Sequence, residues 1–403
     1  MAHTGTKEIL WSRTFTLTTL GMFFLFIPFA LYLPVMPVYL LKELHSSMEA
    51  AGAVNGIFLI AAVLFRAQTA RLEGRFGSRR VLLASGFLFV ATNLLYLSAT
   101  TVAGVMLIRF FSGACFAVAN TGIQAMGSRL IPRSRVGEGL AYITTMVLAG
   151  GAIGPYLGLT LSQTLGYRAV FILSALVSLL GMLILCAMTI PDERPQIKRG
   201  FSFHDLYEWK AVPVSLIILV IAIAYGGVLT FVAVYAAELR LTAAANYFFV
   251  VMAAASVAAR VTTGRMYDRF GPDAAIYPAI VLMAAGLLLM GCIHSAAGLL
   301  SAAALIGVGY GMAVPSIQTL AIQISPPHRA SEVTATVFTC LDGGVGLGAY
   351  LLGGSILAFG YANVYLALGL LTLACTCFYY AMRRRARAEK TYALEEITEK
   401  ELP

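Results

Sequence analysis

Charged side chains are scarce in this chain. Of its 403 residues, 12% are Asp, Glu, Lys or Arg, whereas 59% are hydrophobic. A water-soluble domain needs more charge on its surface than this, so the composition excludes an ordinary soluble fold. A lipid bilayer removes the requirement, because its hydrocarbon accepts apolar side chains. The composition therefore predicts an integral membrane protein.

The chain also lacks the residue clusters that enzymes and metal sites require. Its five histidines are scattered, and it has no Walker loop, no HExxH motif and no nucleophile elbow. Its six cysteines lie in apolar runs, and only Cys375 and Cys377 are close together. A Cys-x-Cys on a helix points its thiols in two directions, so we interpret the cysteines as small core residues. We expect no catalytic residue, no metal and no cofactor.

Long apolar runs are what the chain does have. Twelve of them are long enough, at roughly 20 residues, to cross the hydrocarbon of a bilayer. They cover residues 15–40, 50–70, 81–99, 103–127, 139–163, 167–190, 212–237, 244–264, 274–294, 297–322, 332–358 and 361–382. The sequence thus predicts an all-α membrane protein with 12 transmembrane helices. The expected organisation is a six-helix bundle in 1–190, a linker in 191–210, a second six-helix bundle in 211–382 and a polar tail in 383–403.

The distribution of Lys and Arg predicts how the chain sits in the membrane. Almost all basic residues fall on the side of the two termini, and the opposite segments hold only Lys42, Arg168 and Arg240. Basic segments stay in the cytoplasm, so we expect a multi-pass protein of the plasma membrane, in bacteria the inner membrane, with both termini cytoplasmic. The net charge of +9 is then an orientation signal, and we expect no nucleic acid partner.

The two halves of the sequence repeat at one fixed offset. Residues of the first half recur in the second as follows: Arg66, Arg75, Phe76 and Gly77 as Arg260, Arg269, Phe270 and Gly271; Pro132, Arg135 and Glu138 as Pro326, Arg329 and Glu332; Gly150 and Gly154 as Gly344 and Gly348. This pattern indicates a duplicated six-helix unit. An even number of spans makes the copies parallel, related by a pseudo-two-fold axis along the membrane normal, with a substrate site near the midplane between them.

Loop motifs connect the repeat to a known family. The segment Gly264-Arg-Met-Tyr-Asp268-Arg269-Phe-Gly271 resembles the G-x-x-x-D-R-x-G signature of the major facilitator superfamily. The equivalent first-half loop keeps Arg75 and Gly77 but has Gly74 at the acid position; substitution by the neighbouring Glu73 is left open. The resemblance implies that these loops act in gating, bracing the opposite half in the outward-open state. A carboxylate gains from a helix N-terminus, so we expect Asp268 to be the dominant brace.

Two further motifs extend the resemblance to helices four and five. Arg109-Phe-Phe-Ser-Gly113 is similar to the family's R-x-x-x-G element. The run Gly150-Gly-Ala-Ile-Gly154-Pro155-Tyr-Leu-Gly158 looks like the pattern of exporters that exchange substrate for protons. This implies a gating role for Gly154 and Pro155; the alternative is simple close packing of helices. Phe65-Arg66 and Ala259-Arg260 resemble a branch that includes opine-metallophore (staphylopine-type) exporters.

The few ionisable groups within spans are candidates for coupling and binding, since charge in hydrocarbon is costly. Arg109 and Asp342 are the proton-coupling candidates, because a carboxyl group inside a span can load and release a proton. For Arg109 the alternative is neutralisation by backbone carbonyls, and for Asp342 a static ion pair with Arg260 or another base. Arg66 and Arg260 occupy matched positions and would attract an anionic substrate; the alternative is snorkelling to the headgroups.

Polar residues on the walls complete the expected binding site. A stripe from Arg109 through Asn120 to Gln124 lies on one helical face, which predicts that it lines a cavity. The other candidate hydrogen-bonding residues are Tyr32, Asn55, Tyr225 and Gln318.

The predicted function is therefore proton-coupled efflux of a small amphipathic or anionic solute by a monomer that alternates its access between the two sides. The alternatives are an importer or uniporter on the same fold, and a membrane receptor or structural subunit that transports nothing. A membrane-embedded enzyme is the weakest alternative, because no catalytic cluster is present.

Overall fold

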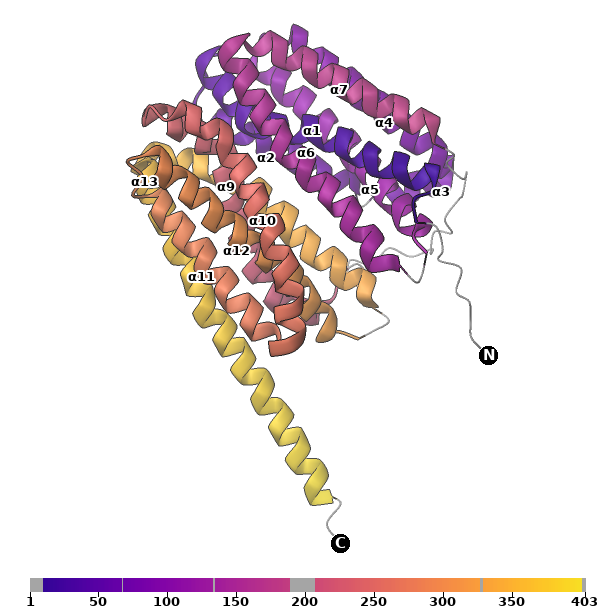
Figure 1. Cartoon of the computed structure of the whole chain (residues 1–403), viewed down its shortest axis with the longest axis vertical. Helices are drawn as coiled ribbons and strands as arrows, with labels where there is room; N and C mark the ends of the chain where they lie inside the picture. The colour runs from indigo at the N-terminus through magenta and orange to yellow at the C-terminus, as the bar shows by residue number, and fades with distance from the viewer. Residues whose placement is uncertain (1–9, 67, 133–134, 189–206, 327–328, 401–403) are drawn as a thin grey trace.

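Helices account for the architecture of the computed structural model, which describes residues 10–66, 68–132, 135–188, 207–326 and 329–400 (Figure 1). The helices are α1 (Arg13–Lys42), α2 (Met48–Arg66), α3 (Thr69–Phe76), α4 (Ser78–Leu95), η1 (Tyr96–Ser98), α5 (Val102–Leu130), α6 (Val136–Thr164), α7 (Tyr167–Ala187), η3 (Trp209–Ala211), α9 (Val212–Glu238), α10 (Thr242–Phe270), α11 (Pro272–Met290), α12 (Ala296–Gln323) and α13 (Ala330–Lys400). Most of the predicted linker lies outside the described residues.

Glycines at matched positions of the repeat turn the chain between helices. Gly77 and Gly271 have φ of 90° and 83°, and Gly166 and Gly360 have φ of 81° and 76°. This left-handed region strains any residue with a Cβ, so glycine fits all four turns. Gly360 divides α13 into two membrane-crossing parts. Both parts belong to one continuous stretch, which counts once among the eleven candidate spans of the described residues. The predicted fold class, 12 membrane helices, is confirmed.

The helices form two groups that pack in the same way. In the first group α6 lies against α1, and α5 lies against α2 and α4. In the second group the corresponding contacts join α13 to α9, and α12 to α10 and α11. Figure 1 shows the first group in indigo to magenta beside the second in orange, with the last part of α13 extending well beyond both. The structure therefore carries the repeat that the sequence predicts.

The glycine strip of α6 is a packing surface inside the first group. A Cβ on Gly154 would lie 2.5 Å from the carbonyl oxygen of Ile27 and 2.8 Å from the nitrogen of Leu31, both on α1. A Cβ on Gly348, its counterpart in α13, would overlap the backbone of Ile223 on α9. Only glycine permits backbones to approach so closely. The strip thus provides the close helix packing that was the alternative to a gating role.

Tight contacts between the two groups are present at one end of the helices. We call the end that carries the start of α1 and Gly77 the terminal face, and the end that carries Gly360 the far face. Near the far face, the amides of Gln163 on α6 and Asn246 on α10 bond reciprocally, at 3.1 and 3.2 Å. On the other side of the molecule, Gly353 of α13 lies so close to Met48 of α2 that a Cβ would be 2.7 Å from its carbonyl oxygen. The two groups are therefore closed against each other at the far face.

Substituting Gly353 tests whether this closure depends on backbone contact. We expect Gly353→Val to force α2 and α13 apart, because overpacking a tight contact costs about 1–3 kcal/mol. Spin labels at Leu165 and Phe359, both exposed near the far face, should then report longer distances than in the unsubstituted protein, in a background without the native cysteines.

Gly354→Val is the matched control. No atom lies within 4 Å of the position that a Cβ would take on Gly354, the next residue in the helix. Its distance distribution should match that of the unsubstituted protein. Equal distributions for both valine variants would show that the Gly353 contact does not set the closure.

Candidate functional site

Asn55 connects the two groups through a buried polar link. Its amide nitrogen donates to the carbonyl oxygen of Leu33 at 2.7 Å and to the hydroxyl of Thr230 on α9 at 3.2 Å. Its amide oxygen accepts a hydrogen bond from the Nη2 of Arg109 on α5. Asn55, Arg109 and Thr230 are all buried. One amide thus joins α1, α2 and α5 of the first group to α9 of the second.

Arg109 is a fully buried cation held by carbonyls and rings. Its Nε donates to the backbone oxygen of Val54 at 3.3 Å, and its Nη1 has no hydrogen-bond partner among the residues that the structure describes. The guanidinium lies over the rings of Phe58, 4.7 Å from the centroid, and Tyr32, 5.6 Å from the centroid. Ring faces and amide oxygens partly replace the water that the charge has lost. This is the neutralisation by neutral groups that the sequence left open as the alternative for Arg109.

Arg66 and Asp342 form an ion pair across the seam between the groups. Arg66 ends α2, and its Nη1 donates to the carboxylate of Asp342 on α13. The two side chains keep 32% and 23% of their surface exposed, so most of the pair is shielded by the protein. Asp342 therefore has the ion pair that the sequence raised as an alternative, and its partner is the base of the opposite group rather than Arg260.

The remaining predicted wall residues make no hydrogen bond or ion pair with Arg66 or Asp342 in the described part of the chain. Tyr225 on α9 stacks flat on Tyr310 of α12, with ring centroids 3.8 Å apart and planes within 8°. On α5, Asn120 is buried and accepts a hydrogen bond from Gln124, which is exposed, at 3.0 Å. Gln318 is half-buried on α12.

The structure also identifies two polar residues that the sequence analysis did not single out, Thr230 and Tyr310. Tyr310 is the repeat counterpart of Phe116, which lies on the Arg109–Gln124 stripe. Applying the repeat to that stripe would have found Tyr310. Thr230 lies within an apolar run, and nothing in its local pattern distinguishes it.

The gating candidates of the loops have the same local geometry in both groups. Arg75 lies over the ring of Phe76 and Arg269 over that of Phe270, each 5.2 Å from the centroid. Asp268 is exposed and has no hydrogen bond or ion pair in the described part of the chain. Bracing by Asp268 remains a prediction for a conformation with the far face open.

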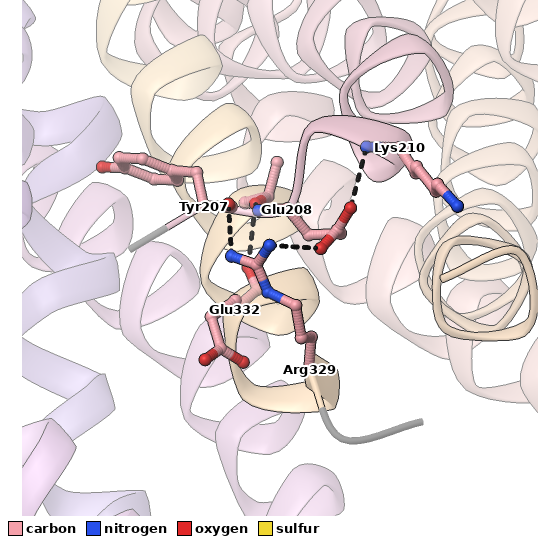
Figure 2. A network of polar contacts seen from close by, with 6 residues as sticks. Tyr207, Glu208, Lys210, Arg329 and Glu332 are labelled. Atoms are coloured by element: carbon pink, nitrogen blue, oxygen red, sulfur yellow. Dashed lines mark hydrogen bonds and ion pairs between the residues drawn. The ribbon is translucent and has the colours of Figure 1, made fainter. Parts of the chain in front are cut away.

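A buried acid from the end of the linker breaks the symmetry of the repeat. In the first group, Arg135 pairs with Glu138 at 2.7 and 2.8 Å. Its counterpart Arg329 instead binds the carboxylate of Glu208 at 3.0 Å and the backbone oxygen of Tyr207 at 3.1 Å (Figure 2).

Glu208 holds the end of the linker against the start of α13. Its side chain is 5% exposed, its carboxylate also accepts from the nitrogen of Lys210 at 3.1 Å, and its own nitrogen donates to the hydroxyl of Thr336 at 3.0 Å. Within the described part of the chain, one buried carboxylate oxygen of Glu332, the counterpart of Glu138, has no hydrogen-bond partner. The linker acid has thus taken the place of Glu332 on Arg329.

Removing the charge of Glu208 should destabilise the second group. We expect Glu208→Gln to lower the stability by about 1–3 kcal/mol, because the ion pair between the buried Glu208 carboxylate and Arg329 is lost. The midpoint of heat unfolding in detergent measures the effect. Combining it with Glu332→Gln should lower the midpoint further, since Glu332 is the nearest replacement acid for Arg329.

Glu138→Gln provides the control within the repeat. Glu138 pairs with Arg135 at the surface, with 42% of its side chain exposed, and such pairs contribute little. Its unfolding midpoint should stay close to that of the unsubstituted protein. A drop as large as that of Glu208→Gln would contradict the assignment of Glu208 as the stabilising acid.

The sequence of the chain is similar to that of a known protein family. The profile of the Major Facilitator Superfamily matches residues 18–349. The multidrug resistance protein MdtG of Dickeya zeae is 25% identical over 95% of this chain and 98% of its own length. The multi-drug resistance efflux pump PmrA homolog of Lactococcus lactis is 25% identical over 88% of this chain and 90% of its own.

A solved structure shares the fold. It is that of a bacterial homolog of the human lysosomal transporter Spinster, in an inward-facing and unoccupied conformation. The match covers 94% of this chain and 98% of the other, with a TM-score of 0.75 and 15% identity. At that identity the likeness concerns the fold alone.

Proposed function

The chain belongs to the major facilitator superfamily, and we propose that it is a proton-coupled exporter of small amphipathic or anionic solutes. It is a multi-pass membrane transporter of small molecules and not an enzyme. Efflux is supported by the relatives named for multidrug resistance. A metallophore-like solute remains a prediction of the resemblance at Arg66 and Arg260.

The ion pair between Arg66 and Asp342 is the observation that carries proton coupling. The pair spans the seam, so the two groups cannot separate there without parting a cation from an anion. Separating such charges where little water is present is costly. A proton on Asp342 removes its charge and with it the attraction to Arg66. Proton binding thus frees the groups to move, and proton release lets the pair form again.

Alternating access follows if α1–α7 rock against α9–α13. With both termini in the cytoplasm, the far face would be extracellular, and the structure would be closed to the outside. Opening outward would then part Gln163 from Asn246 and α2 from α13, while the loop with Asp268 would come to brace the opposite group. Arg109 and Asn55 would keep the polar link at the centre, from which protons and solute are exchanged.

Replacing Asp342 tests the coupling. In acidified inside-out vesicles, a transported solute should release protons through the unsubstituted protein. We expect Asp342→Asn to abolish this release, because the asparagine cannot carry the proton, while solute still exchanges down its own gradient. The solutes are a panel of fluorescent amphipathic cations and anions, and the readout is a fluorescent pH probe.

Asp273→Asn is the matched control. Asp273 also forms an ion pair with an arginine, Arg383 at 2.8 Å, but both belong to the second group. It should release protons at the normal rate. Normal release by Asp342→Asn would refute the coupling role, and transport without any proton movement in the unsubstituted protein would favour a uniporter.

A further inference from the structure

Arg260 is a half-buried cation for which the described part of the chain supplies neither an acid nor a hydrogen-bond acceptor. Its repeat counterpart Arg66 is paired with Asp342. Arg260 makes no hydrogen bond or ion pair there, and its Nε is buried without a partner. Arg66 and Arg260 together carry two positive charges, and the carboxylate of Asp342 compensates only one of them, which leaves a net positive charge. An uncompensated charge in a membrane interior is costly, so an anionic partner would be strongly stabilised.

Two tyrosines supply a flat surface next to this cation. Tyr225 and Tyr310 form the parallel stack of α9 and α12. A Cβ on Gly311, the residue after Tyr310, would lie 2.7 Å from the backbone oxygen of Ser256 on α10, one turn before Arg260, so Arg260 and Tyr310 lie on adjoining turns of two packed helices. Neither tyrosine is fully enclosed, unlike Tyr365 and Tyr379 of the same group. Neither hydroxyl bonds to another residue of the described chain. A stacked pair that is partly open offers a ring face and two free hydroxyls to a ligand.

We propose that Arg260, Tyr225 and Tyr310 form a subsite for the negative group and the ring of a planar aromatic anion. This rests on the proposed transport function and names its substrate class. The anionic group binds the free guanidinium, and the ring extends the tyrosine stack. A cationic solute is disfavoured, because the carboxylate of Asp342 already pairs with Arg66.

Calorimetric titration of the purified full-length protein in detergent tests the subsite with three probes. The probes are 2-naphthoate, its cationic analogue 2-naphthylmethylammonium, and the saturated decahydro-2-naphthoate, which keeps the charge but loses the flat ring. We expect 2-naphthoate to bind at least about tenfold more tightly than either analogue, since only it satisfies both the charge and the stack. Arg260→Gln should weaken it by about tenfold or more, and Tyr310→Leu should weaken it while sparing the decahydro compound.

Arg265→Gln is the control, because Arg265 lies on the same helix but is exposed. Its affinity for 2-naphthoate should be unchanged. Equal affinity of the unsubstituted protein for the naphthyl cation and anion, or undiminished binding by Arg260→Gln, would overturn the subsite.

The two proposals fail separately. Proton release driven by other solutes, without binding of 2-naphthoate, would leave the exporter in place and remove the aromatic anion. Normal proton coupling by Asp342→Asn, together with Arg260-dependent binding of 2-naphthoate, would remove the coupling role and keep the subsite.

Discussion

Hydrocarbon cannot solvate a charge, and the three arginines inside this molecule meet that constraint in three different ways. Arg109 is surrounded by a carbonyl, an amide oxygen and two ring faces, all neutral. Arg66 forms an ion pair with a carboxylate of the opposite group. Arg260 has neither solution within the described chain. These environments imply different behaviour. The contacts of Arg109 are permanent, the contact of Arg66 can be broken by a proton on its partner, and the charge of Arg260 can be neutralised by a bound anion.

The places where the repeat is broken are the places where these roles appear. The two groups share their turns, their glycine contacts and the arginines over Phe76 and Phe270. They differ where Asp342 replaces the Leu148 of the first group, and where Glu208 rather than Glu332 binds Arg329. A duplicated scaffold can rock symmetrically. Coupling to protons additionally requires a titratable charge in one group that pairs with an opposite charge in the other group. The departures from symmetry therefore hold the interactions specific to this chain.

The sequence could predict the helices and the repeat, because both depend on local apolar runs and on residues at a constant spacing. It also identified Asp342, Arg66, Asn55 and Arg109, because polar groups in apolar runs stand out. It could not predict which of them meet. The partner of Asp342 lies on the other group, and the choice of Arg66 over Arg260 depends on how the groups dock. Thr230 was missed for the same reason, since its importance comes only from Asn55 across the seam.

The contacts across the seam form a gradient in chemical character that favours a hinge-like motion. At the far face they are steric contacts of glycine and a pair of neutral amides, which no change in pH alters. At the centre lies the neutral bond from Asn55 to Thr230. At the end of α2 toward the terminal face lies the ion pair of Arg66 and Asp342, which is partly exposed. Of these contacts, the ion pair is the one that responds to a proton. A proton therefore acts at one end of the seam, while the neutral contacts hold the other end closed. When Asp342 loses its charge, the ion pair with Arg66 is lost. The neutral contacts alone then determine how readily the far face opens.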